Sequence, residues 1–370
     1  MRVLICGGGV IGTTLAYFLA RRGVEAVVIE RCEIACAASG GSGGFLALDW
    51  CDGSPVSQLA RRSFALHEEL AAQLDGAAWG YRRLDTLGVL ASARRDLGPY
   101  RQLDSPDWLD PDAVVHGKIG SVETTAQVDP ARFTRAMLAA AVARGAQLVS
   151  GEVTGLVGAR DGVVAGVTVD GRELSADAVV LAMGPWSVRA CQWGPLPAVV
   201  GLKGHSLVLR YTPPREPQAL FVELETANGE QASPEVIPRP DGTTYVCGLP
   251  EHAPLPADPA RVATTPEASE RLRAMTACFS SELAAADVVA TGACYRPVTQ
   301  DGLPLIGPVP GIEGAYVATG HGSWGMLNAP ATGEAMTELV LDGAAQTVDL
   351  ADFDPARLPA HDDPTSHSRG

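Results

Sequence analysis

The opening of the chain places a glycine-rich turn between a short apolar segment and a helix pattern. RVLIC, residues 2–6, is typical of a buried strand, and GGGVIG follows it directly. TTLAYFLARRG then has the spacing of an amphipathic helix closed by Gly23, and EAVVIE, residues 25–30, is a second apolar strand. Together these segments predict a β-α-β unit over residues 2–30.

The glycines of this turn and the acid after it point to a dinucleotide. Gly7, Gly9 and Gly12 form GxGxxG, in which the first glycine makes the turn, the second admits a pyrophosphate and the third packs helix on strand. The helix N-terminus offers free N–H groups to the phosphates. Glu30 ends the second strand, where a carboxylate can accept both hydroxyls of an adenosine ribose. This unit alone does not decide whether the dinucleotide is FAD or NAD.

Composition narrows the class of protein. A chain of 370 residues with 46% hydrophobic content can bury a large core and suggests two domains. The net charge of -15 argues against nucleic acid and against a polybasic membrane surface as partners. Without an apolar run of bilayer length we expect a cytoplasmic protein. The eight cysteines lack paired CxxC spacing, so we expect most of them to be small buried residues, with no disulfide framework and no metal site.

Beyond the first unit, the chain alternates between two patterns. Amphipathic stretches predict further helices at residues 57–74, 129–148 and 329–343. Strands that run into glycine turns cover residues 177–187 and 314–326, and they are typical of the same α/β arrangement.

The middle of the chain has a different character. Residues 198–290 predict an antiparallel sheet with its own helix at about 268–283. Two strands within residues 152–171 are joined by an Asp-Gly turn. The residues from about 354 onward are expected to form a polar tail.

Two features favour FAD over NAD. CAASGGSGG, residues 36–44, is too rich in glycine for a regular element, so we expect a loop whose backbone lies close to a ligand. DAVVLAMG and AYVATGHG add two strand-to-glycine turns, which could bring backbone around an extended flavin. An NAD-dependent dehydrogenase would have no obvious use for these segments.

Several motifs, in this order, resemble the D-amino-acid oxidase superfamily, above all its branch with glycine oxidase and monomeric sarcosine oxidase. They are GGGVIGTTLAYFLARRGVEAVVIER, AAS at 37–39, VVLAMGPWS, RPVTQDGLPLIG and ATGHGSWGMLNAPATGE. The resemblance implies an α/β fold in which a Rossmann-type FAD-binding domain is interleaved with a substrate domain built on an antiparallel sheet. It also implies that a small amino acid or secondary amine is oxidised by hydride transfer to flavin N5, and that dioxygen reoxidises the flavin to give hydrogen peroxide.

Matching the chain to this family predicts domains and cofactor contacts. The FAD-binding domain would comprise residues 1–75, 120–190 and 291–370, and the substrate-binding domain residues 76–119 and 191–290. The residues expected to hold FAD lie mainly in the glycine turns and strand ends: Gly7, Gly9, Val10, Ile11, Gly12, Glu30, Arg31, Ala38, Ser39, Gly43, Gly44, Val153, Gly184, Cys294, Gly320, Gly322, Ser323, Trp324, Gly325 and Met326.

Three residues are expected at the reacting end. Arg296 matches the arginine of the family's RP motif, which implies that it pairs with a substrate carboxylate; the alternative is an arginine paired with an internal acid. Lys203 could stabilise superoxide near the flavin, or it could simply face solvent. His321 stands where the family places residues close to the flavin ring, although it could instead bond to backbone.

Cys294 carries a further implication of the resemblance. In sarcosine oxidase relatives a cysteine in this segment bonds to the flavin 8α-methyl, and its spacing to a downstream Asp is that of Cys294 to Asp301. The alternative is an inert buried thiol. Trp324 could cover the substrate or pack in the core.

The substrate pocket departs from the family pattern. Candidates to line it, each equally able to be structural, are Glu235, Tyr245 and His205. Ile237 stands near the place of a tyrosine that contacts the carboxylate in glycine oxidase, and GSG at 41–43 replaces an expected basic residue. Because of these departures, the sequence does not identify the substrate. Two other functions remain as alternatives: a flavin dehydrogenase that reduces a quinone or carrier protein, and a flavin-binding scaffold without turnover.

Overall fold

The predicted opening unit lies at the centre of a parallel sheet. In this computed structural model, which describes residues 1–94, 97, 105–214 and 218–361, β1 (Arg2–Cys6) and β2 (Glu25–Glu30) pair in parallel. The helix α1 (Val10–Arg21) connects them. The local signals of strand, glycine turn and helix were therefore sufficient to place this unit.

Strands from distant parts of the chain complete this six-stranded sheet, in the order β19-β20-β12-β1-β2-β8. The strands added are β8 (Gln147–Ser150), β12 (Ala178–Leu181), β19 (Leu305–Pro308) and β20 (Ala315–Thr319). All neighbours pair in parallel except β19 with β20. The carboxyl ends of the parallel strands consequently meet at one edge, where open α/β sheets bind ligands.

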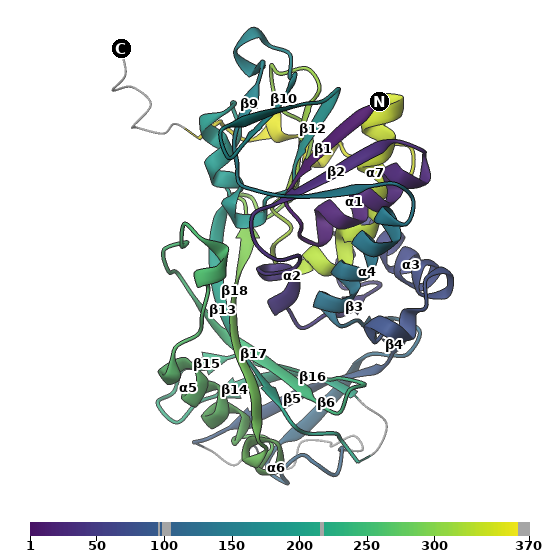
Figure 1. Ribbon diagram of the computed structural model, residues 1–370. Helices are drawn as coiled ribbons and strands as arrows, with labels where there is room; N and C mark the ends of the chain where they lie inside the picture. Colours follow the sequence, from purple (N-terminus) through teal and green to yellow (C-terminus); the bar gives the residue numbers. More distant parts are fainter. Residues whose placement is uncertain (95–96, 98–104, 215–217, 362–370) are drawn as a thin grey trace.

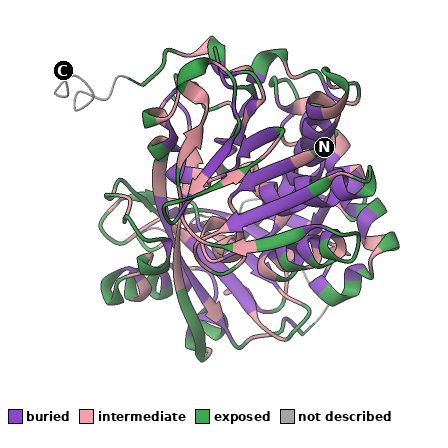
Figure 2. Ribbon diagram, turned by 45° about the horizontal axis from the view of Figure 1, so that its top comes forward, coloured by how far each residue is buried: buried purple, intermediate pink, exposed green. Residues whose placement is uncertain are grey.

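The two faces of this sheet are covered differently (Figure 1). Val3 and Ile5 pack with the helices α1, α3 (Ser57–Gln73), α4 (Pro130–Val142) and α7 (Gly325–Asp342). Leu4 and Cys6 point the other way, toward a small sheet of β9 (Val153–Val157), β10 (Gly166–Val169) and β11 (Arg172–Ser175). Because both faces are covered, β1 and the central part of β2 are buried (Figure 2).

A second, larger sheet runs β18-β13-β17-β16-β14-β5-β6, with β15 paired to β14 off this path. Its strands are β5 (Asp85–Ser92), β6 (Val114–Gly120), β13 (Val200–Leu209), β14 (Gln218–Glu225), β15 (Gln231–Ala232), β16 (Glu235–Pro238), β17 (Thr244–Glu251) and β18 (Val288–Val298). The expected antiparallel pairing holds except that β14 and β5 are parallel. Leu272 and Leu283, from α5 (Pro266–Thr276) and α6 (Ser281–Ala285), pack on one face.

A further small sheet has three antiparallel strands in the order β3 (Phe45–Ala47), β7 (Thr125–Gln127) and β4 (Arg82–Arg83). The one-turn helix α2 (Ala38–Gly41) precedes β3 in the chain. Single turns of 3-10 helix cover Gly76–Trp79, Ala159–Asp161, Pro259–Arg261, Gly322–Trp324, Ala351–Phe353 and Pro355–Arg357, and a longer one covers Gly184–Gln192.

The structure corrects several local expectations. The helix predicted over 129–148 ends at Val142, because Gly145 has a φ of 98° and the next residues form β8. The stretch 36–44 contains the one-turn helix α2, where only a loop was expected. The helix predicted at 268–283 is two helices, because the Ser280 hydroxyl accepts a hydrogen bond from Leu283 N and starts α6.

Two further expectations were wrong. Cys32 and Cys36 form a disulfide across four residues, so this pair does not serve as buried apolar side chains. The described part of the predicted tail is held in place, since Arg357 Nε donates to Asp301 Oδ2 at 2.8 Å. Residues 362–370 lie outside the described part.

The predicted domain division remains a prediction. The strand β18 begins at Val288 and lies wholly in the larger sheet, whereas the prediction divides the chain at 291. Within the described residues, no helix has the length and apolar character needed to cross a bilayer.

Candidate cofactor and substrate site

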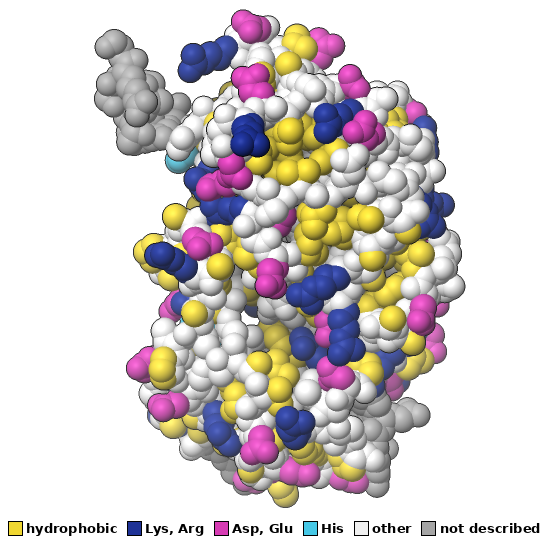
Figure 3. Space-filling view, in the orientation of Figure 1, with side chains coloured by type: hydrophobic (Ala, Val, Ile, Leu, Met, Phe, Trp, Pro, Cys, Tyr) yellow, Lys and Arg dark blue, Asp and Glu magenta, His cyan; other side chains and the backbone are white. Residues whose placement is uncertain are grey.

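A cavity lies where the carboxyl ends of β1, β2 and β12 face the larger sheet. Its wall includes most of the predicted residues: Gly7, Gly9, Val10, Ile11, Glu30, Arg31, Ala38, Ser39, Gly43, Val153, Gly184, Cys294, Arg296, His321, Gly322, Ser323, Gly325 and Met326. Five residues predicted to hold FAD or to act at the reacting end are not part of the wall: Gly12, Gly44, Lys203, Gly320 and Trp324. The pocket candidate His205 is not part of it either. The space-filling view, in the orientation of Figure 1, shows hydrophobic and charged side chains interspersed over this face of the molecule (Figure 3).

The GxGxxG turn is built for close backbone contact. Gly7 has a φ of 120°, and a Cβ added there would lie 2.4 Å from the carbonyl oxygen of Ala182. A Cβ on Gly12 would lie 2.0 Å from the carbonyl oxygen of Gly7. Gly12 therefore allows helix and strand to pack, as the motif predicts, without touching the cavity itself.

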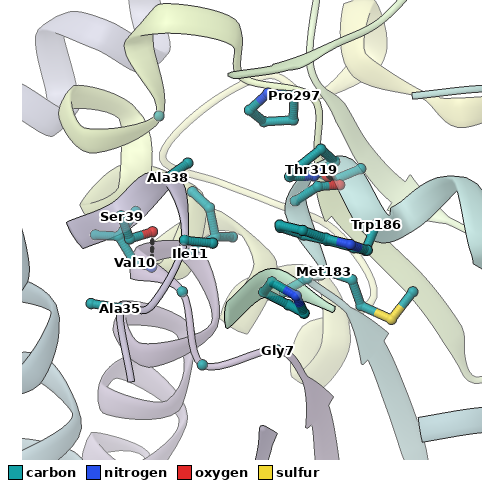
Figure 4. A pocket seen from close by; sticks show the side chains of 18 of the residues that line it. Gly7, Val10, Ile11, Ala35, Ala38, Ser39, Met183, Trp186, Pro297 and Thr319 are labelled. Carbon is teal, nitrogen blue, oxygen red and sulfur yellow. Dashed lines mark hydrogen bonds between the residues drawn. The ribbon is translucent and has the colours of Figure 1, made fainter. Parts of the chain in front are cut away.

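The N-terminus of α1 meets the second glycine-rich segment. The Val10 N–H donates to the Ser39 hydroxyl at 2.9 Å, and both residues face the cavity (Figure 4). Because this hydroxyl oxygen already accepts a hydrogen bond, its own proton is available to an acceptor in the cavity. A phosphate is such an acceptor, and the positive end of the helix dipole favours it.

Glu30 is held in one orientation by backbone. Its Oε2 accepts from Gly8 N at 2.7 Å and its Oε1 from Cys32 N at 2.8 Å. A carboxylate oxygen has a second lone-pair site, so both oxygens remain able to accept from ribose hydroxyls. The disulfide of Cys32 and Cys36 lies in the same segment, and Cys36 lines the cavity.

Beside Glu30, two arginines share one carboxylate. Arg31 Nη1 and Arg189 Nη1 lie 2.7 and 2.6 Å from Glu152 Oε1. Arg31 also donates to the carbonyl of Ala257. The Arg31 guanidinium is thus held in place by protein groups.

Two other glycine turns leave room for a flat ring system. Gly184 and Gly322 have φ values of 54° and 55°, and an added Cβ would meet no atom within 4 Å at either position. Both line the cavity. With the phosphate-binding turn and the oriented Glu30, this open backbone fits FAD.

The larger sheet forms the opposite wall, and its register decides which predicted residues face the cavity. On β13 and β18, Gly204 pairs with Cys294 and Leu202 with Arg296, while Lys203 pairs with Tyr295. Since neighbouring residues on a strand point to opposite faces, Cys294 and Arg296 share the cavity face.

Lys203 and His205 are consequently on the other face of the sheet. Lys203 Nζ and His205 Nε2 lie 3.0 and 3.2 Å from Glu251 Oε1. His205 Nδ1 lies 2.7 Å from the Thr264 hydroxyl. The prediction that these residues act in the pocket is corrected: Lys203 is a buried ion-pair partner, and the Lys203 ammonium lowers the pKa of Glu251.

His321 reaches the cavity as a neutral ring. It is 5% exposed, and burial lowers its pKa to about 3. Neither ring nitrogen has a hydrogen-bond partner among the described residues. The expected alternative, a bond from the ring to backbone, is not formed, so one donor and one acceptor remain for a ligand.

Two wall residues of β17 alternate with a core residue. Tyr245 and Cys247 both line the cavity, and the Tyr245 hydroxyl donates to Gly41 O at 2.8 Å. Sequence reasoning had named Tyr245 but missed Cys247. The alternation in TTYVCG was the available signal, because residues two apart on a strand share a face.

The remaining predicted residues have structural roles. An added Cβ would lie 2.0 Å from Val128 O at Gly44 and 2.7 Å from Thr299 Cγ2 at Gly320. The Trp324 ring packs edge-on to Trp50, with centroids 6.3 Å apart. Trp324 therefore belongs to an aromatic group beside the site and does not line the cavity.

Cys294 does line the cavity. Burial raises the pKa of its thiol, while Arg296 acts in the opposite direction. The two alternatives for Cys294, a covalent tether to the flavin and an inert buried thiol, are not decided by this position. No group of three or more His, Cys, Asp or Glu side chains among the described residues is arranged to hold a metal ion.

Residues 2–339 match the family described as FAD dependent oxidoreductase. The chain belongs to this family. The oxidoreductase C1F5.03c from Schizosaccharomyces pombe is 30% identical to this chain over 379 residues, which cover 95% of this chain and 97% of that protein. A glycine oxidase from Pseudomonas putida is also 30% identical over 379 residues, covering 96% of this chain and 98% of the oxidase.

Solved structures support the same fold. A glycine oxidase from Geobacillus kaustophilus has a TM-score of 0.77 at 24% identity, with coverage of 96% of this chain and 98% of that one. The expected α/β architecture with an interleaved antiparallel sheet is confirmed. The protein is an FAD-dependent oxidoreductase of the D-amino-acid oxidase family.

Proposed function

We propose that this enzyme oxidises the C–N bond of a small amino acid or secondary amine, with dioxygen as the electron acceptor and hydrogen peroxide as a product. The observation that carries the proposal is Arg296. Its guanidinium lines the same cavity as the GxGxxG turn, and it forms no salt bridge with any described residue. An arginine on the wall of a cavity with no salt-bridge partner is suited to an anionic ligand, and its fork matches a carboxylate.

The wall supplies positioning groups around that anchor. Arg296 would hold the substrate carboxylate through two parallel hydrogen bonds, which fixes the adjacent carbon. His321, neutral across the physiological range, would offer a hydrogen bond without adding charge. Bound FAD supplies the hydride acceptor, and the apolar part of the wall keeps water from the reacting carbon.

The named relatives support this reaction class. Glycine oxidases from two Pseudomonas species are each 30% identical to this chain over nearly its whole length. Solved structures with the same fold include an iminodiacetate oxidase and an L-proline dehydrogenase. The names of these enzymes share oxidation of an amine-bearing compound, although they differ in substrate.

One observation favours a second candidate, a flavin dehydrogenase that reduces a quinone or a carrier protein. Lys203, the cation expected to stabilise superoxide, is paired with Glu251 on the face away from the cavity. A site without that lysine has lost one group that would favour dioxygen as acceptor.

An anaerobic screen tests both candidates. Holoprotein is mixed with small amino acids and secondary amines while flavin absorbance is followed, and air is then admitted. We expect bleaching by at least one substrate, followed by rapid recolouring with one peroxide formed per flavin. If the flavin is recoloured only by an added quinone, the result supports the dehydrogenase. If no compound bleaches the flavin, the result supports a flavin-binding scaffold without turnover.

A further inference from the structure

A second charged group lies in the wall of the same cavity as Arg296. Glu235, the first residue of β16, lines the same wall. Its side chain is only partly exposed, and its described hydrogen-bond donor is the Cys247 thiol, whose Sγ lies 3.6 Å from Oε2. A thiol is a weak donor, so this carboxylate lacks a strong partner.

Sheet register places both charges over the same surface. Glu235 pairs with Cys247, Cys247 with Ser206 and Ser206 with Gly292, so these positions share one face. Arg296 lies four residues after Gly292 on β18. Because alternate residues of a strand share a face, Arg296 is on that face as well.

Small residues occupy several sheet positions between the two charges. A Cβ added at Gly204 would lie 3.6 Å from Nη2 of Arg296, so the guanidinium extends over β13 toward the middle of the sheet. Ser206 and Gly292, which pair two positions further along these strands, also have a small side chain or none. The thiols of Cys247 and Cys294 are on the same face, and both line the cavity together with Arg296 and Glu235.

The two groups influence each other without pairing. Arg296 lowers the pKa of Glu235, against the larger effect of burial, which raises it. The two nevertheless form no salt bridge, since no nitrogen of Arg296 lies within 4.0 Å of a Glu235 oxygen. Each partly buried charge therefore lacks a close counter-ion, which is costly unless a ligand or water supplies one.

We propose that Glu235 binds the amino group of the substrate while Arg296 binds its carboxylate, so that the site selects amino acid zwitterions over simple amines and simple carboxylic acids. This inference rests on the proposed function and names its substrate class. A zwitterion satisfies both wall charges at once, whereas a plain carboxylate leaves Glu235 unpaired and is repelled by it.

The same contact can prepare the amine for oxidation. A proton passes from the substrate ammonium to a Glu235 oxygen: the N–H bond breaks, its electron pair stays on nitrogen, and an O–H bond forms. Nothing is oxidised or reduced in this step, which leaves the neutral amine. Burial makes the Glu235 carboxylate a stronger proton acceptor than an exposed one.

A matched pair of ligands isolates the amino group. 2-Aminoisobutyrate has no hydrogen on its α-carbon and cannot be oxidised there, and isobutyrate is the same skeleton without the amine. Binding of each to the holoenzyme is titrated through the change in flavin absorbance. We expect the wild type to prefer 2-aminoisobutyrate, and Glu235→Gln to lose about tenfold or more of that affinity while isobutyrate binding holds or improves.

Two further variants separate recognition from folding. Glu235→Asp keeps the charge and should restore part of the preference. Glu223→Gln makes the same chemical change at an exposed position on β14 and should leave the preference intact. FAD content and thermal unfolding of each variant show whether the protein is folded.

The outcomes distinguish this inference from the proposed function. An unchanged preference in Glu235→Gln, equal loss of both ligands, or a wild type without preference would overturn the role of Glu235. If an amino acid bleaches the flavin in that case, the proposed reaction class survives. If the preference depends on Glu235 but no amino acid bleaches the flavin, the zwitterion site stands and the proposed reaction fails.

Discussion

His67 Nε2 lies 3.0 Å from the carbonyl oxygen of Met326, which Pro330 leaves without its usual helical donor. The same nitrogen is 3.2 Å from Leu327 O. The Ala331 N–H, the normal partner of that second carbonyl, donates instead to the Ser63 hydroxyl at 3.0 Å. Two side chains of α3 thus replace hydrogen bonds in the first turns of α7, beside the cavity residue Met326.

We predict that His67→Phe destabilises the holoprotein by about 1–3 kcal/mol, because a buried carbonyl loses its donor while ring packing against Phe133 is kept. Urea unfolding measures the loss. Pro330→Ala supplies a backbone N–H to Met326 and should recover part of it in the double variant. Equal effects of Pro330→Ala in both backgrounds would contradict this coupling.

Stability should fall in mild acid because of the same histidine. Burial lowers the pKa of His67 from 6.5 to about 4, so between these values the unfolded chain binds a proton that the folded chain excludes. Its contribution to the free energy of unfolding is complete above pH 6.5 and is lost as the pH falls toward 4, at up to about 1.4 kcal/mol per pH unit.

His67→Phe should therefore have a shallower acid slope than the wild type. Chemical unfolding at several pH values between 4 and 7 makes the comparison. His321→Asn should also flatten the slope, since burial lowers the pKa of His321 to about 3. Parallel slopes in all three proteins would show that neither histidine titrates on unfolding in this window.

Arg296→Met should impair the reaction without releasing the cofactor. Loss of a charged, two-bond contact to a carboxylate costs about 3 kcal/mol, or roughly 100-fold in kcat/KM. Arg296→Lys should be intermediate, and the exposed Arg210→Met serves as the control. Stopped-flow reduction measures the rates; equal rates for Met and wild type at this position would remove Arg296 from substrate binding.

We expect acid precipitation to release the flavin from the protein, because burial raises the pKa of the Cys294 thiol and leaves little thiolate to form a bond. The absorbance of the supernatant is the measurement. A yellow pellet that becomes colourless in Cys294→Ser would instead establish the tether.

Local signals predicted one side of the site well. The turn from Gly7 to Gly12 and the acid Glu30 belong to a single continuous unit, so their positions follow from strand, helix and turn patterns. The opposite wall depends on register between strands. A sequence does not reveal that Lys203 pairs with Tyr295 and so faces away, because that pairing joins segments far apart in the chain.

The sequence also does not show which side chains replace the backbone hydrogen bonds that are missing in α7. Pro330 is visible in the sequence as a helix breaker, but its compensation comes from Ser63 and His67 on another helix. Cys247 could have been predicted more easily, because it lies two residues from Tyr245 on the same strand. The sequence did not show which face of that strand lines the cavity.

The order of strands in the six-stranded sheet has a consequence for the synthesis of the protein. β1 is made first but sits between β2 and β12, while β20 and α7 are made last. During synthesis, the apolar surface of the first unit therefore stays without its final packing partners until some three hundred further residues have been made. Because Gly7 and Gly322 line the same cavity, FAD can find its complete binding surface only after Gly322 has been made.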